Sequence, residues 1–128
     1  FNNAGELYVA FYDYNSQDLK LAQKNGSSCS GWSVEDVDKT GDVGKYASLG
    51  FTSDDTPYIA YHDASNGTLK VAYKENGAWG YEVVDGGNGV VAGIFADLAV
   101  GNDDRVHITY AVEDDRNVIK YAVSYVAE

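Results

Sequence analysis

LKLAQKNG (19–26) returns fifty positions later as LKVAYKENG (69–77), and again after another fifty as IKYAVS (119–124). The flanking segments repeat as well, since residues 7–24 and 57–74 are identical at seven of eighteen aligned positions. A fixed period of about 50 residues is typical of propeller blades and of comparable repeat arrays. The 128-residue chain is therefore predicted to be a single repeat segment, with units at about 1–45, 46–94 and 95–128.

Short runs rich in Tyr, Val, Ile, Phe and Trp, separated by Gly, Asn, Asp and Ser, predict β-strands. They lie at 7–12, 18–23, 32–37, 46–51, 57–62, 68–73, 79–84, 95–100, 106–111 and 118–126. Hairpin turns, with Asn and Gly at positive φ, are expected at NSQD (15–18), SNGT (65–68), ENGAW (75–79) and EDDRN (113–117). Both faces of YVAFY (8–12) and YIAYH (58–62) are apolar or aromatic, as in a sheet covered on both sides. The pattern predicts an all-β fold, a β-propeller segment of about two and a half four-stranded antiparallel blades.

The second unit (46–85) resembles the repeats of secreted bacterial and archaeal β-propeller proteins. The match is carried by Ser48, Leu49, Pro57, Ile59, Tyr61, Asp63, Leu69, Lys70, Ala72, Trp79, Glu82 and Asp85. The sialidase-type Asp-box S-x-D-x-G-x-T-W is absent, so the resemblance is to sialidase-like and lectin-like propellers without that motif. It implies an extracellular or cell-surface protein whose strand at 46–51 is innermost and whose strand at 79–84 is outermost. The third unit departs from the pattern, because Ala111 and Val112 replace the polar pair of the other units.

Ten strands do not make whole four-stranded blades, and two and a half blades cannot close a ring of four to eight. Exposed sheet edges and apolar faces pair with other chains. We therefore expect the chain to associate with further blades, either from the same parent protein or from identical chains.

The chain carries 20 acidic and 9 basic residues, a net charge of −11. This charge argues against nucleic acid and against anionic lipid surfaces as partners, because both require a basic face. The acidity suits either solubility or cation binding. The sequence contains no run of eighteen apolar residues, which a membrane-spanning helix would need. The single cysteine, Cys29, cannot form a disulfide within this sequence and is either incidental or bonded to another chain or to a further part of the same protein.

Aromatic and acidic residues at equivalent repeat positions are the candidate ligand-binding residues: Trp32, Trp79, Tyr12, His62, Asp13 and Asp63. The two tryptophans begin equivalent outer strands, where aromatic rings can stack on sugars or can simply pack between blades. Alternatively, His62 is an ordinary strand residue. As a zinc motif, His62 and His107 without a cysteine pair are weak. Oxygen ligands in the acidic turns at 13–18, 63–68 and 113–117 would suit Ca²⁺, but the spacing completes no calcium loop, and Asp in a turn commonly bonds its own backbone. No cofactor is therefore expected.

The sequence contains neither a nucleophile elbow nor a phosphate-binding glycine loop followed by a helix. Nearly equivalent units favour a non-enzymatic extracellular module that recognises glycan or protein, or that builds a surface assembly. The alternative is a fragment of an extracellular carbohydrate-active enzyme, a glycosidase or polysaccharide lyase, whose catalytic residues lie in other blades.

Overall fold

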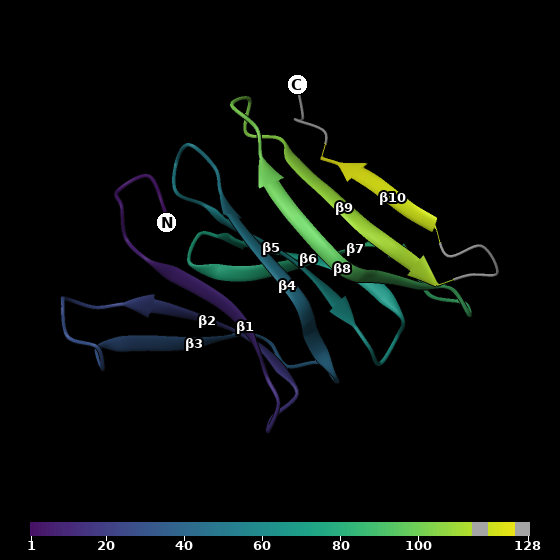
Figure 1. Ribbon diagram of the computed structural model, residues 1–128, viewed down its shortest axis with the longest axis horizontal. Helices are drawn as coiled ribbons and strands as arrows, with labels where there is room; N and C mark the ends of the chain where they lie inside the picture. Colours follow the sequence, from purple (N-terminus) through teal and green to yellow (C-terminus); the bar gives the residue numbers. More distant parts are fainter. Residues whose placement is uncertain (114–117, 125–128) are drawn as a thin grey trace.

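The computed structural model describes residues 1–113 and 118–124, which form three antiparallel sheets (Figure 1). Sheet 1 contains β1 (Tyr8–Asp13), β2 (Asp18–Lys24) and β3 (Trp32–Asp38). Sheet 2 contains β4 (Val43–Phe51), β5 (Pro57–Asp63), β6 (Thr68–Glu75) and β7 (Ala78–Gly86). Sheet 3 contains β8 (Val91–Val100), β9 (Val106–Glu113) and β10 (Val118–Val123). No helix forms within the described residues, and hence none that could cross a membrane, so the all-β prediction is confirmed.

The strands within each sheet follow chain order, so every neighbouring pair is a hairpin. Sheet 2 lies between the other two, and its edge strand β4 packs against both β1 and β8 (Figure 1). The contact between sheets 1 and 2 is called the first seam below, and that between sheets 2 and 3 the second seam.

Strands β4 and β8 begin three and four residues earlier than predicted, whereas the other starts agree within one residue. In both strands the pairing register shifts, between Val43 and Ser48 and between Ala92 and Asp97. Such β-bulges interrupt the two-residue alternation that identifies a strand in sequence. The glycine-containing starts of these strands therefore resemble loops until the pairing is known.

The three predicted turns within the described residues form, but not always through the predicted residue. Gly67 and Asn76 have positive φ, as expected, whereas in the first turn the left-handed residue is Gln17 rather than Asn15. Asn15 instead donates its backbone N–H to the Asp13 carboxylate at 3.0 Å. Residues 114–117 of the fourth predicted turn and 125–126 of the last predicted strand lie outside the described part of the chain.

Each seam has its own apolar core. The first contains Leu19, Leu21, Val37, Val43, Ile59, Tyr61 and Ala72, and the second contains Ala60, Leu69, Val71, Ala92, Leu98, Val106, Ile108, Tyr110 and Val112. The successive residues Ile59 and Ala60 of β5 belong to different cores because side chains alternate between the two faces of a strand. Sheet 2 is thus covered on both faces, as its sequence pattern predicted.

The seams close where a glycine lies directly on a leucine of the preceding sheet. A Cβ atom on Gly44 would lie 2.8 Å from Cα of Leu19, and one on Gly93 would lie 2.9 Å from Cα of Leu69. Both glycines have φ near +100°, at 107° and 89°, where other residues are strained. A side chain at either position would push the sheets apart, so both seams depend on the same close approach of glycine to leucine.

Candidate functional site

An Asp–Tyr–Lys contact is built into both seams at equivalent positions. In the first seam, the Asp38 carboxylate at the end of β3 accepts hydrogen bonds from Tyr61 Oη, at 2.6 Å, and from Lys70 Nζ. In the second seam, Asp85 accepts from Tyr110 Oη at 2.9 Å and from Lys120 Nζ at 2.8 Å. Because the same three residue types recur at the same repeat positions, these contacts serve the packing of one sheet on the next.

The electrostatics of the first contact follow from its burial. Burial alone would raise the pKa of Asp38, but hydrogen bonds from Lys70, Thr40 and Tyr61 outweigh it and hold the pKa at about 2. Burial, with the hydrogen bond to Asp38, raises the pKa of Tyr61. Burial and the bond to Asp85 raise the pKa of Tyr110 to about 12. At neutral pH the aspartate is therefore ionised and the tyrosines are protonated donors.

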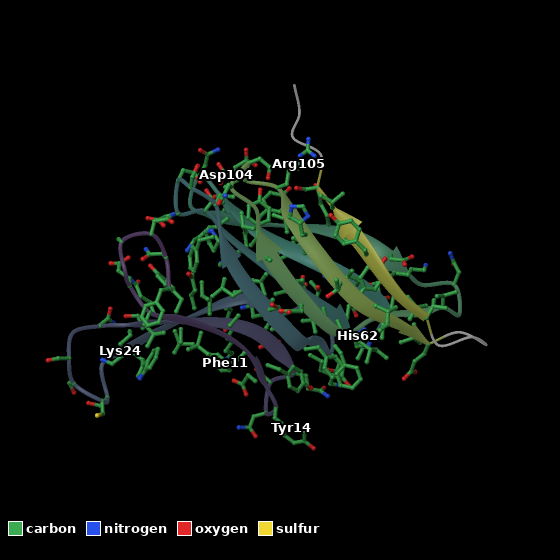
Figure 2. All side chains as sticks on the ribbon, turned by 45° about the horizontal axis from the view of Figure 1, so that its top comes forward. Phe11, Tyr14, Lys24, His62, Asp104 and Arg105 are labelled. Atoms are coloured by element: carbon green, nitrogen blue, oxygen red, sulfur yellow. The ribbon has the colours of Figure 1, made fainter. Side chains whose placement is uncertain are left out.

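Acidic turns join the sheets at one end of both seams. Asp55 accepts from the backbone N–H of Asn3 at 2.7 Å, and the equivalent Asp104 accepts from that of Ser53 at 2.6 Å. Figure 2 shows Asp104 and Arg105 at this end, opposite Tyr14 and His62. Within the described residues no three His, Cys, Asp or Glu side chains converge as a metal site would require. Asp55 and Asp104 thus bond the neighbouring sheet, whereas Asp54 and Asp103 bond groups of their own turns.

Three side chains from β3, β6 and β7 meet across the first seam, and together they are called the tryptophan site: Glu35, Lys74 and Trp79. The ammonium of Lys74 lies 2.8 and 2.7 Å from the two carboxylate oxygens of Glu35 and 5.4 Å from the centre of the Trp79 ring. Trp79 Nε1 also donates to Glu35, at 3.3 Å. A hollow of about 110 Å³ adjoins the carboxylate, lined by Tyr8, Leu21, Gln23, Ser33, Val34 and Glu35.

The tryptophan site combines a carboxylate, an ammonium and an indole, and the carboxylate of Glu35 lines the hollow. Trp79 is partly buried and also packs against the first core. Hydroxyl groups of a ligand could accept from Lys74 and donate to Glu35, while the remaining ring surface offers an apolar contact.

Trp32 occupies the equivalent position in sheet 1, but on a face that no other described sheet covers. Lys24 lies 5.7 Å from the centre of its ring, as Lys74 does near Trp79. Instead of a carboxylate, the Lys24 ammonium contacts backbone carbonyl oxygens of the neighbouring loop, those of Asn25, Gly26 and Gly31. Only half of the tryptophan site is therefore present there.

The other four predicted residues lie at the opposite end of the strands from the tryptophans. Strand pairing places Trp32 opposite Lys24, near the start of β1, whereas Tyr12 and Asp13 lie at the end of β1. Tyr12 donates to Asp42 at 2.8 Å, across the first seam. The predicted residues thus fall into two groups at separate ends.

His62, Asp13 and Asp63 have structural partners. The His62 ring is buried, with Nδ1 2.7 Å from the carbonyl oxygen of Ala92. Asp63 accepts from the backbone and side chain of Asn66, at 3.0 and 2.8 Å. Asp13 bonds the ammonium of Lys20 at 2.8 Å, and this bond lowers the pKa of the Asp13 carboxyl.

Several residues near these sites were not predicted, namely Glu35, Lys74, Asp42, Lys45 and Tyr46. For two of them a signal existed in the repeat. Lys74 matches Lys24, and Glu35 lies in VEDVD (34–38), which aligns with YEVVD (81–85). Asp42 and Lys45 have no counterpart of the same type in the second unit, so the repeat could not mark them.

No protein-family model matches this chain, and no curated protein matches it. A solved structure with a similar fold is that of a fucose lectin from Kordia zhangzhouensis in complex with methyl-fucoside. The TM-score is 0.54 at 12% sequence identity, and the match covers 100% of this chain and 96% of that one. The likeness shows that the chain has a lectin-like all-β fold.

Proposed function

We propose that this protein is a non-enzymatic carbohydrate-binding module and that the tryptophan site of the first seam binds a sugar. The observation that carries the proposal is the meeting of Glu35, Lys74 and Trp79 beside an open hollow. A planar aromatic ring with a few fixed polar groups is the usual composition of a small-ligand site. The fold similarity to a fucose lectin supports the same class of ligand.

We also propose that the three sheets are blades of a β-propeller completed by further blades, from the same parent protein or from identical chains. Two seams of equal geometry support a repeating arrangement about an axis. The outer face of sheet 3 supports a missing neighbour. Ile119 is 81% exposed, although the aligned Leu19 and Leu69 are fully buried by the following sheet. Sheet 1 likewise exposes Val9 and Val34 on its free face. A secreted or cell-surface location fits this reading.

Binding of glycan-array oligosaccharides to the wild-type chain and to Trp79→Ala and Glu35→Gln tests the sugar site. We expect each variant to lose at least about tenfold in affinity for the glycans bound at the tryptophan site, and Trp32→Ala, which removes an equal ring without a carboxylate contact, to lose less. Circular dichroism of each variant reports folding. If Trp79→Ala unfolds, Glu35→Gln still decides, because the Glu35 side chain is exposed. Unchanged binding by folded Glu35→Gln would contradict the proposal, and turnover of array glycans would favour the enzyme alternative.

A further inference from the structure

A second polar and aromatic cluster lies at the end of the first seam opposite the tryptophan site. It is called the tyrosine rim and consists of Tyr12, Tyr14, Asp42, Lys45 and Tyr46. The first two residues come from the end of β1 and the turn after it, and the others from the start of β4 and the residue before it. Figure 2 shows Tyr14 at the tip of its turn, pointing away from the body of the molecule.

The polar centre of the rim is a Tyr–Asp–Lys triad. Asp42 accepts from Tyr12 Oη at 2.8 Å with one oxygen and from Lys45 Nζ at 2.5 Å with the other. The Lys45 ammonium also lies 5.3 Å from the centre of the Tyr12 ring. The bond from Lys45 lowers the pKa of Asp42, and the same bond raises the pKa of Lys45. The lysine and aspartate are therefore both charged at neutral pH and together carry no net charge.

Two exposed rings belong to residues close to this triad along the chain, Tyr14 two residues after Tyr12 and Tyr46 directly after Lys45. Tyr14 is 84% exposed and meets Tyr12 edge-on, with ring centres 6.5 Å apart. Tyr46 is 43% exposed and lies 4.9 Å from Phe95 of the next sheet. Both Tyr46 and Phe95 have positive φ, so the unusual backbone belongs to the bulge of both strands rather than to the rim alone.

The second seam shows that the fold does not require the triad. His62, Val91 and Ile94 occupy the positions of Tyr12, Asp42 and Lys45. That seam nevertheless has the same glycine-on-leucine approach and the same bond between sheets. The N–H of Ala92 bonds the Gly67 carbonyl at 3.0 Å, as the N–H of Val43 bonds that of Gln17. Half-exposed ion pairs also contribute little to stability. Sheet packing therefore does not account for the polar residues of the rim.

We infer that the tyrosine rim is a second carbohydrate site, separate from the tryptophan site, and that it binds a neutral sugar. Each Asp42 oxygen has one hydrogen-bond partner and can accept from a sugar hydroxyl. Lys45 can donate to ring or hydroxyl oxygens, and the faces of Tyr46 and Tyr14 can contact C–H groups of the sugar. The neutral ion pair on a chain of net charge −11 disfavours anionic sugars.

Sites at opposite ends of one seam have a consequence for multivalent glycans. A single sugar cannot occupy both sites, so each chain presents two separate binding points. Such a chain could join two glycan branches and gain avidity without any new contact.

The chain itself supplies the variant that tests the rim. Asp42→Val with Lys45→Ile installs the residues of the second seam, where the same backbone folds with them. Saturation-transfer NMR would use four probes: methyl α-L-fucoside, methyl β-D-galactoside, methyl α-D-mannoside and N-acetylneuraminic acid. The measurements are made on the wild-type chain, on Glu35→Gln, on the double variant and on the three changes combined.

We expect Glu35→Gln to retain binding of at least one neutral probe and the combined variant to lose it by tenfold or more. Equal binding by these two proteins would overturn the inference, and so would the absence of any neutral-sugar binding to Glu35→Gln. Stronger binding of N-acetylneuraminic acid than of the three neutral probes would overturn the neutral-sugar assignment. Binding of a protein ligand at the rim without any response to the sugars would make the rim a protein-docking site. The proposed tryptophan site is judged separately, by whether Glu35→Gln alone weakens binding.

Discussion

Replacement of Asp38 by Asn tests the electrostatic reasoning most directly. The change keeps the size of the side chain but removes the negative charge that faces Lys70 in the first seam. Both groups are deeply buried, with side-chain exposures of 1% for Asp38 and 10% for Lys70. The variant would therefore leave the buried ammonium with only the more distant carboxylate of Asp63, 3.9 Å away.

The magnitude follows from the pKa of Asp38. Its value of about 2, against an ordinary 3.8, corresponds to about 2 kcal/mol at about 1.4 kcal/mol per pKa unit. Breaking a buried pair typically costs about 3–5 kcal/mol when the partner is left uncompensated, and the remaining contact of Lys70 with Asp63 places this variant at the lower end of that range. We expect Asp38→Asn to lower the free energy of unfolding by about 3 kcal/mol at neutral pH. Because the folded pKa is depressed, the contribution is complete above about pH 4 and is lost as the pH falls toward about 2.

The second seam supplies a matched control in Asp85→Asn. Lys120 and Asp85 are 43% and 27% exposed, so water screens this pair and its loss should cost about 1 kcal/mol or less. Urea denaturation at pH 7 and pH 3, followed by circular dichroism, measures both variants. Wild-type stability should fall toward that of Asp38→Asn as the pH is lowered. Equal losses for the two variants, or a cost below 1 kcal/mol for Asp38→Asn, would refute the reasoning.

Three other predictions concern association, metal and backbone. The isolated chain should associate at micromolar concentration in sedimentation, and Ile119→Lys should reduce this association; a monodisperse wild-type species at 13.8 kDa would contradict the proposed missing neighbour. Excess chelator should leave the melting temperature unchanged, because Asp13 and Asp63 already bond turn groups and lysine; a fall of more than a few degrees would reveal a bound metal. Gly93→Ala should lower the free energy of unfolding, measured by urea denaturation, by at least about 2 kcal/mol more than Gly77→Ala. Gly77 has a similar φ, but no atom lies within 4 Å of its added Cβ. Equal losses for the two variants would mean that the close approach of Gly93 to the preceding sheet is unimportant.

Strand existence and order could be predicted because both depend on patterns along a few residues. Alternation and turn residues located ten strands. The apolar residues on both faces of β5 correctly indicated a sheet with a neighbouring sheet on each face. The early starts of β4 and β8 could not be predicted, because the bulges around Tyr46 and Phe95 break the alternation on which such a prediction depends.

The candidate sites were predictable only in part. Trp79 was identified from its repeat position, but its partners Glu35 and Lys74 were not, since Glu35 is 39 and 44 residues away from Lys74 and Trp79 along the chain. A linear pattern contains no information on how one sheet is offset against the next. For the same reason, the contacts of Asp42 and Lys45 with Tyr12 could not be predicted, because they exist only where β4 starts beside the end of β1.

The repeat by itself determined that three similar sheets follow one another, because identical local sequences form identical strands and turns. Only the tertiary structure decided which residues of neighbouring sheets face each other across a seam. That choice depends on the packing of whole sheet surfaces, where the absence of a side chain at Gly44 and Gly93 sets how closely the sheets approach. It also distinguished equivalent residues by their surroundings: Leu69 is buried by the following sheet, whereas Ile119, at the same repeat position, lies on an uncovered face.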